Sequence, residues 1–88
     1  MFVAHMRTNS NGLKITIPIE LTNLIRQFSP DIRFLNKVTL RKDDSQIDIP
    51  HPIMARGSGN SHYFPIPASV VKAHSLVADD EVNVVLEW

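Results

Sequence analysis

The first half of the chain carries a strand pattern followed directly by a helix pattern. Residues 13–17 alternate apolar and polar side chains with a period of two, which predicts a half-buried strand. Pro18 then suits the first position of a helix. Four apolar residues follow at the spacing i, i+3, i+4 and i+7, and form one helical stripe: Leu21, Leu24, Ile25 and Phe28. Ser29-Pro30 ends the helix, because a residue before proline avoids the helical conformation. We expect this stripe to lie in the core.

The rest of the chain predicts a hairpin, a glycine-rich loop and a second strand–helix–strand unit. Residues 37–41 and 47–49 alternate around the turn at Asp43-Asp44-Ser45, as in a hairpin. A glycine-rich loop covers 55–61, a short strand 63–66 and a helix 67–74 with Val70 and Val71 turned inward. After a turn at Asp79-Asp80, residues 82–88 alternate as the last strand. We expect Trp88 to be a core residue.

Two Ile-Pro dipeptides divide the chain into similar halves. Ile17-Pro18 and Ile66-Pro67 each follow a strand pattern and precede a short helix and a further strand. Neither half could bury its apolar faces alone, whereas two halves packed together could. We predict a single, mainly β domain over 1–88 with two short helices and internal pseudo-two-fold symmetry. The half-repeats cover about 7–50 and about 59–88, with a linker at about 51–61. Met1–Met6 is left out of this fold prediction.

Composition favours a small intracellular protein. The chain has 88 residues and no cysteine, which excludes a disulfide framework or a thiolate metal site. No segment has the pattern of a signal peptide or a membrane span, so a cytoplasmic protein is expected. The net charge is zero, but residues 1–60 hold eight basic and five acidic residues (+3), and residues 61–88 hold one basic and four acidic residues (−3). This asymmetry is compatible with a basic face on a neutral protein.

Two segments resemble a known family of DNA-binding domains. Residues 59–88, with Gly59-Asn60-Ser61, Ile66-Pro67-Ala68 and Leu76 followed by Asp79-Asp80-Glu81-Val82, resemble the DNA-binding domain of the MazE antitoxin. Residues 12–25, with Gly12 and Ile17-Pro18-Ile19-Glu20-Leu21, resemble AbrB. The chain is therefore similar to the AbrB/MazE (SpoVT-AbrB) swapped-hairpin family, with two half-repeats in one chain. The matched segments cover about half of it.

The resemblance implies a fold, a function and a set of contact residues. In that family two halves, normally from two chains, interleave as swapped hairpins into a small β-barrel that binds double-stranded DNA. The implied DNA-binding residues are Arg7, Asn11 and Lys14 in the first half, and Arg56, Ser58, Asn60 and His62 in the second. Arginine and lysine would neutralise phosphates, and arginine can also bind guanine edges. The family often has a basic residue before Ile-Pro, where this chain has Thr16 and Pro65.

No pattern of catalytic or metal-binding residues emerges. The four histidines do not stand at the spacing of metal ligands on one helix, and no Ser/His/Asp set has a distinguishing context. Asp79-Asp80-Glu81 is typical of a polar turn. Residues 57–60 lack the lysine and helix of a phosphate-binding loop. We expect a regulator that is not an enzyme and needs no cofactor.

Two other interpretations stay open. One is an antitoxin or other interaction module that binds a cognate toxin or another protein. The other is an adaptor that has lost DNA binding, which the zero net charge would suit. In each case the chain could also form a homodimer.

Overall fold

The computed structural model describes residues 2–9, 12–56 and 61–88, which form strands and two helices. In chain order the elements are β1 (Phe2–His5), β2 (Arg7–Asn9), β3 (Gly12–Ile17), α1 (Ile19–Phe28), β4 (Lys37–Lys42), β5 (Ser45–Pro50), β6 (Ala55–Arg56), β7 (His62–Pro65), α2 (Ala68–His74) and β8 (Glu81–Glu87). The prediction of a mainly β chain with two short helices is confirmed.

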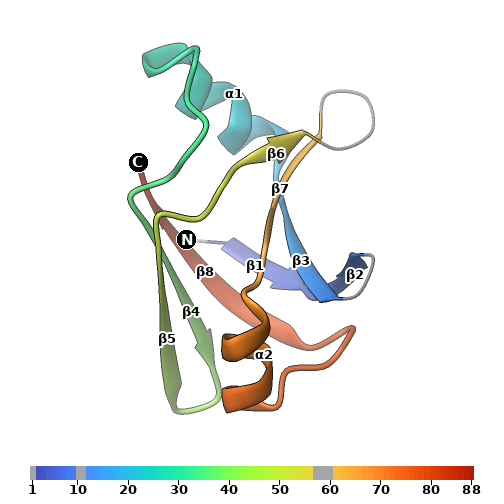
Figure 1. Cartoon of the computed structure of the whole chain (residues 1–88). Helices are drawn as coiled ribbons and strands as arrows, with labels where there is room; N and C mark the ends of the chain where they lie inside the picture. Colours follow the sequence, from blue (N-terminus) through green and yellow to red (C-terminus); the bar gives the residue numbers. More distant parts are fainter. Residues whose placement is uncertain (1, 10–11, 57–60) are drawn as a thin grey trace.

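The strands form two antiparallel sheets of four strands each (Figure 1). The strand order is β1-β8-β4-β5 in the first, here called sheet A, and β2-β3-β7-β6 in the second, sheet B. The chain passes from sheet A to sheet B at Met6, whose N–H donates to the Asp80 carbonyl and whose carbonyl accepts from the Asp79 N–H. The two helices lie at opposite ends of the sheets, α1 beside β6 and α2 near the turn of the β4–β5 hairpin. The described strands thus make two sheets rather than one closed barrel.

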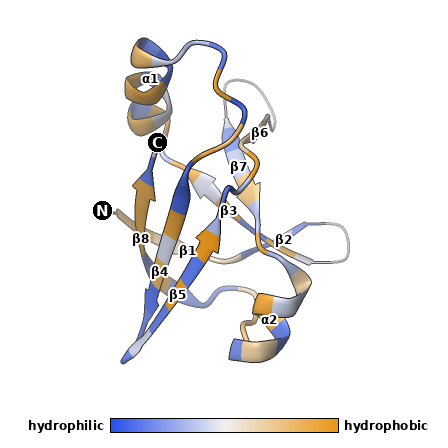
Figure 2. Cartoon of the chain, turned by 60° about the vertical axis from the view of Figure 1, so that its left-hand side comes forward, coloured by the Kyte–Doolittle hydropathy of each residue, from blue (hydrophilic) through white to orange (hydrophobic). Residues whose placement is uncertain are grey.

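The core lies between the sheets and is built from the alternating residues of their strands. Figure 2 shows hydrophobic and hydrophilic residues alternating along β4 and β5. Buried apolar side chains come from both sheets and from the connections between them: Met6, Leu13, Ile15, Ile17, Ile25, Leu35, Val38, Leu40, Ile47, Ile49, Met54, Phe64, Ile66, Leu76, Val82 and Val84. At about 25 cal/mol per Å² of buried apolar surface, this cluster is the main stabilising contribution to the fold.

Most elements expected from the sequence are where the patterns indicated. The strand at 13–17, the hairpin, both helices and the final strand are all present. Both helices begin directly after a proline, and the backbones of Pro18 (φ −55°, ψ 139°) and Pro67 (φ −56°, ψ 138°) are nearly identical. Extended backbone at each proline turns the chain from a strand of sheet B into a helix.

Two predictions about buried side chains are wrong. On α1, Ile25 is fully buried, but Leu24 is 42% and Phe28 72% exposed, so only part of the apolar stripe meets the core. The buried face of α1 also includes Thr22, which shifts it away from Leu24. Trp88 is 43% exposed and follows the end of β8, where sheet A no longer covers it.

The N-terminal segment belongs to the fold. Phe2–His5 is strand β1, paired with β8 from Phe2↔Val84 to His5↔Glu81, and Met6 is fully buried. Leaving Met1–Met6 out of the fold prediction was therefore wrong. The segment pairs with residues about eighty positions away, and no local pattern indicates such a partner.

Candidate nucleic-acid interface

The outer face of sheet B carries a cluster of polar and basic side chains. On β3, Leu13, Ile15 and Ile17 face the core, so Lys14 and Thr16 lie on the opposite face. On β7, Phe64 is buried while Tyr63 and Pro65 are half-buried. The register pairs Lys14 with Pro65 and Thr16 with Tyr63. These four side chains therefore form the centre of the outer face of sheet B.

Lys14 is held against the aromatic ring of Tyr63. Its Nζ lies 4.5 Å from the ring centroid, which is the geometry of a cation–π contact. Such a contact contributes about 0.5–1 kcal/mol at an exposed site. Lys14 has no carboxylate partner among the described residues, so its charge stays available to an anionic ligand.

Arg7 lies next to Lys14 across the β2–β3 pair. The two residues are direct cross-strand partners. Arg7 Nη1 donates to Asp79 Oδ1 at 3.2 Å, and both side chains are largely exposed. An exposed pair of this kind contributes at most about 1 kcal/mol and opens readily. The outer face therefore offers two neighbouring cations, one of them weakly paired.

The second half of the predicted site is arranged differently. The register pairs Arg56 with His62, and His62 with Ile17 on β3. Arg56 therefore stands level with Ile17 across sheet B, three residues along β3 from Lys14. The His62 side chain is only 7% exposed, and its Nε2 lies 2.8 Å from Arg26 Nη1. Asn11, Ser58 and Asn60 lie outside the described residues.

The acidic residues near the C-terminus do not form a separate acidic region. Asp80 is 2.8 Å from Lys42 Nζ, Glu87 is 3.9 Å from Lys37 Nζ and Glu81 is 3.4 Å from His5. The Lys42 ammonium and the Val77 N–H hold the pKa of the Asp80 carboxyl below its ordinary value. Folding thus mixes the two charge groups that the sequence separates. Acidic side chains of residues 61–88 are therefore paired with basic side chains of the first part of the chain rather than set apart from them.

Three residues that the sequence analysis did not single out line this region and its neighbourhood. Tyr63 lies under Lys14, and its strand pattern alone gave no sign of a cation partner. Arg26 and Arg33 line a cavity between α1, the following loop and β7. Each arginine is unremarkable in the sequence, and only the folded loop brings the two to one cavity.

The described residues contain no cluster of three or more His, Cys, Asp or Glu side chains that could hold a metal ion. No helix in the described part of the chain is long and apolar enough to cross a membrane. The chain matches no family model, no curated protein and no solved structure.

Proposed function

We propose that this chain is a cytoplasmic DNA-binding transcriptional regulator of the AbrB/MazE type. Its contact surface is the outer face of sheet B, and the observation that carries the proposal is the adjacent pair of cations Arg7 and Lys14 beside Tyr63. Lysine and arginine side chains neutralise DNA phosphates, and this electrostatic contribution dominates non-specific affinity. The proposed function involves no catalysis and no cofactor.

A swapped-hairpin arrangement with internal symmetry is supported by the strand order. In sheet B the central strands β3 and β7 are each flanked by the strand that precedes them, β2 and β6. In sheet A the central strands β4 and β8 each follow a helix. Strand β5 flanks β4, and strand β1 flanks β8. A two-fold rotation that exchanges β3 with β7 and β2 with β6 leaves the order of sheet B unchanged. The same rotation leaves the order of sheet A unchanged if it exchanges β4 with β8 and β5 with β1.

The register of β3 and β7 has the same symmetry. If Ile17 is equivalent to Ile66, then Ile15 is equivalent to Phe64, and these two residues pair with each other. The pair Lys14↔Pro65 then maps onto Tyr63↔Thr16, which is also present. We infer a pseudo-two-fold axis through the Ile15–Phe64 pair. The nearly identical backbones of Pro18 and Pro67 support it.

This symmetry makes the two halves of the contact face chemically different. Under the same equivalence Lys14 corresponds to Tyr63, and Arg7, the cross-strand partner of Lys14, corresponds to Ala55, the partner of Tyr63. Cations thus occupy one half of the described face, and an aromatic ring and a methyl group occupy the other. We expect phosphate contacts to be concentrated in the half that contains Arg7 and Lys14.

The experiment that tests the function is a fluorescence-anisotropy titration of duplex DNA at several salt concentrations. Lys14→Ala should weaken binding and reduce the slope of log affinity against log salt by about one, because one phosphate contact is lost. Arg41→Ala is the matched control, since Arg41 is an exposed cation on β4 of sheet A with no ion pair among the described residues. Equal effects of the two substitutions would show that charge alone, and not this face, matters.

Asp79 provides a test with the opposite sign. Asp79→Asn removes the carboxylate that accepts from Arg7 at 3.2 Å, and so leaves Arg7 with its full charge for a phosphate. We expect Asp79→Asn to tighten DNA binding at low salt, and Glu87→Gln, at the far end of β8 beside Lys37, to leave it unchanged. Weaker binding of Asp79→Asn would mean that Asp79 positions Arg7 for contact.

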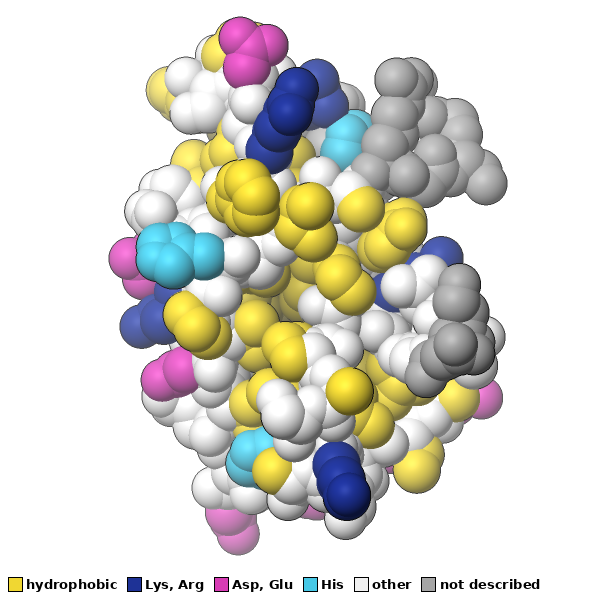
Figure 3. All heavy atoms as spheres, viewed as in Figure 1, with side chains coloured by type: hydrophobic (Ala, Val, Ile, Leu, Met, Phe, Trp, Pro, Cys, Tyr) yellow, Lys and Arg dark blue, Asp and Glu magenta, His cyan; other side chains and the backbone are white. Residues whose placement is uncertain are grey.

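A second candidate function is binding to a protein, such as a toxin, or to a second copy of the chain. The observation that favours it is a set of large apolar side chains left exposed, among them Phe28, Phe34 and Trp88 at 72%, 57% and 43%. In Figure 3, hydrophobic side chains form a band across the middle of one face. Light scattering over a concentration series tests self-association, and Phe28→Ser should abolish any dimer built on α1.

A further inference from the structure

We propose that the cavity between α1 and β7 binds a small molecule through an oxyanion, a phosphate or a carboxylate, held by Arg26. The cavity has a volume of about 510 Å³ and opens to solvent. Cavities of about 300–1,000 Å³ are typical of small-molecule sites. The proposal is independent of DNA binding, because His62 lies on the core side of sheet B, whereas Lys14 and Tyr63 lie on its outer side.

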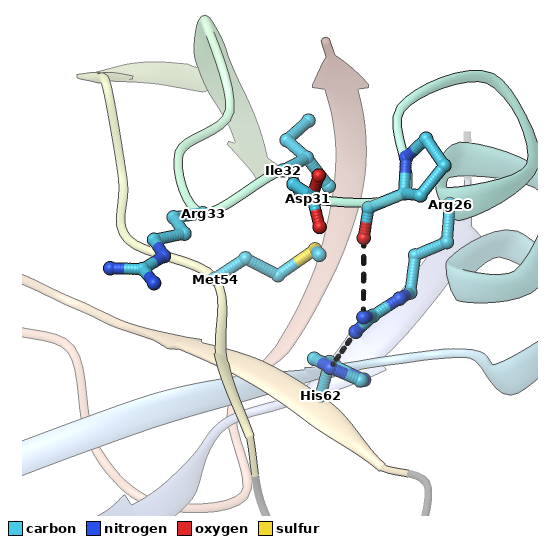
Figure 4. A pocket seen from close by; sticks show the side chains of 7 residues that line it. Arg26, Asp31, Ile32, Arg33, Met54 and His62 are labelled. Carbon is cyan, nitrogen blue, oxygen red and sulfur yellow. Dashed lines mark hydrogen bonds between the residues drawn. The ribbon is translucent and has the colours of Figure 1, made fainter.

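Arg26 is fixed in position by two uncharged acceptors. Its Nη1 lies 2.8 Å from His62 Nε2, and its Nη2 donates to the Pro30 carbonyl at 3.3 Å (Figure 4). A guanidinium has only donors, so His62 Nε2 must accept, and the imidazole carries its proton on Nδ1. Neither acceptor neutralises the guanidinium. The two contacts use two of its five N–H groups, so donors remain for a ligand.

The charge of the cavity wall favours an anion. Arg33 also lines the cavity, with its guanidinium directed away from Arg26 and His62 in Figure 4, and neither arginine forms an ion pair with any described residue. Asp31 is the acidic residue among the described lining residues, and it forms no ion pair with either guanidinium. Figure 3 shows Lys or Arg side chains beside a His side chain at the α1 end of this face. Two cations against one carboxylate leave the wall positive.

The lining is mainly polar, with a smaller apolar part. Half-buried Ile32 and Met54, which is 6% exposed, supply this apolar part. The Met54 N–H donates to the Arg33 carbonyl at 2.7 Å, which fixes the loop after α1 against the chain leading to β6. An oxyanion on an organic body could contact half-buried Ile32, which a bare inorganic anion cannot do to the same extent. Charge-assisted hydrogen bonds from Arg26 would orient the oxyanion.

The proposal is tested by titrating the ¹⁵N-labelled protein with phenyl phosphate, benzoate and inorganic phosphate in separate NMR experiments. We expect phenyl phosphate or benzoate to shift the Arg26 Nε–H and the backbone amides around Asp31, Arg33 and Met54. The one that binds more tightly identifies the preferred oxyanion. Inorganic phosphate should bind more weakly than phenyl phosphate, because it lacks the ring that would contact Ile32.

Substitutions separate this site from general surface charge. Arg26→Gln should weaken binding by about tenfold, the loss expected for one charge-assisted contact. Arg33→Gln keeps the Arg26–His62 contact and should weaken anion binding by a smaller factor. It therefore replaces Arg26→Gln as the test variant if Arg26→Gln disturbs the fold. Asp31→Asn should tighten binding, because it removes the opposing charge. Arg41→Gln, on sheet A, is the control and should change nothing.

Three results would overturn the proposal. The first is that none of the three anions shifts the resonances around the cavity. The second is that Arg41→Gln weakens binding as much as Arg26→Gln, which would indicate non-specific attraction. The third is that Asp31→Asn weakens binding of the anion, which would make the Asp31 carboxylate part of its recognition rather than an opposing charge. Loss of DNA binding in the Lys14→Ala protein, with phenyl phosphate binding intact, would support two separate sites.

Discussion

Neighbouring residues on α1 allow a sharp test of which helix face is buried. Ile25 is fully buried and Leu24 is 42% exposed. Replacement by alanine removes three carbon atoms from each side chain. For Ile25→Ala, three buried carbon groups at about 0.8 kcal/mol each, plus the cavity left behind, give a loss of about 3–4 kcal/mol. For Leu24→Ala, partial burial with no enclosed cavity gives about 1 kcal/mol.

Urea denaturation followed by far-ultraviolet circular dichroism measures both losses. With a slope of about 1–1.5 kcal/mol per M for a domain of this size, Leu24→Ala should lower the midpoint by about 1 M or less, and Ile25→Ala by about 2–4 M. If Ile25→Ala does not fold, Ile25→Val, with an expected cost of about 1 kcal/mol, replaces it. A Leu24→Ala loss as large as that of Ile25→Ala would refute the orientation of α1.

Two further predictions concern the connection between α2 and β8, which contains Ser75 and Asp80. The pKa of Asp80 is lowered from 3.8 by Lys42, so the charged form stabilises the fold. That stabilisation is complete above pH 3.8 and is lost as the pH falls through the lower folded-state value, so Asp80→Asn should reduce the Tm more at pH 7 than at pH 2. Ser75, at the end of α2, has φ 53° and ψ 43°, a left-handed conformation that favours glycine. Ser75→Gly should therefore raise stability by about 0.5–1 kcal/mol, whereas the same change at Ser69 inside α2 should lower it by about as much, both measured as Tm.

The local elements could be predicted from the sequence because each carries its own periodic pattern. Strand β3, the β4–β5 hairpin and α1 follow from alternation and from the prolines beside them. The exact burial of α1 could not be predicted, because Leu24 and Ile25 both fit an apolar stripe. Only the position of α1 on the sheets decides between them. Strand β1 lacked a local signal, since its partner β8 lies at the other end of the chain.

The arrangement of the candidate site depends on pairings that the sequence does not show. The family resemblance named Arg7 and Lys14, and only the β2–β3 pairing makes them direct neighbours. His62 was expected at the same surface, but the Arg26 guanidinium binds it from α1, far away in the chain. The basic and acidic parts of the sequence also mix on folding, because β8 lies between β1 and β4 and brings acidic residues to His5 and Lys37.

The most direct test of the proposed function is the salt dependence of duplex DNA binding by the wild type, Lys14→Ala and Arg41→Ala. We predict that wild-type affinity falls steeply between low and physiological salt, because phosphate contacts release counterions. Lys14→Ala should reduce the slope by about one, whereas Arg41→Ala should follow the wild type. Absence of binding to varied duplexes at low salt, or equal losses in both variants, would contradict the assignment of the outer face of sheet B as a DNA-binding surface.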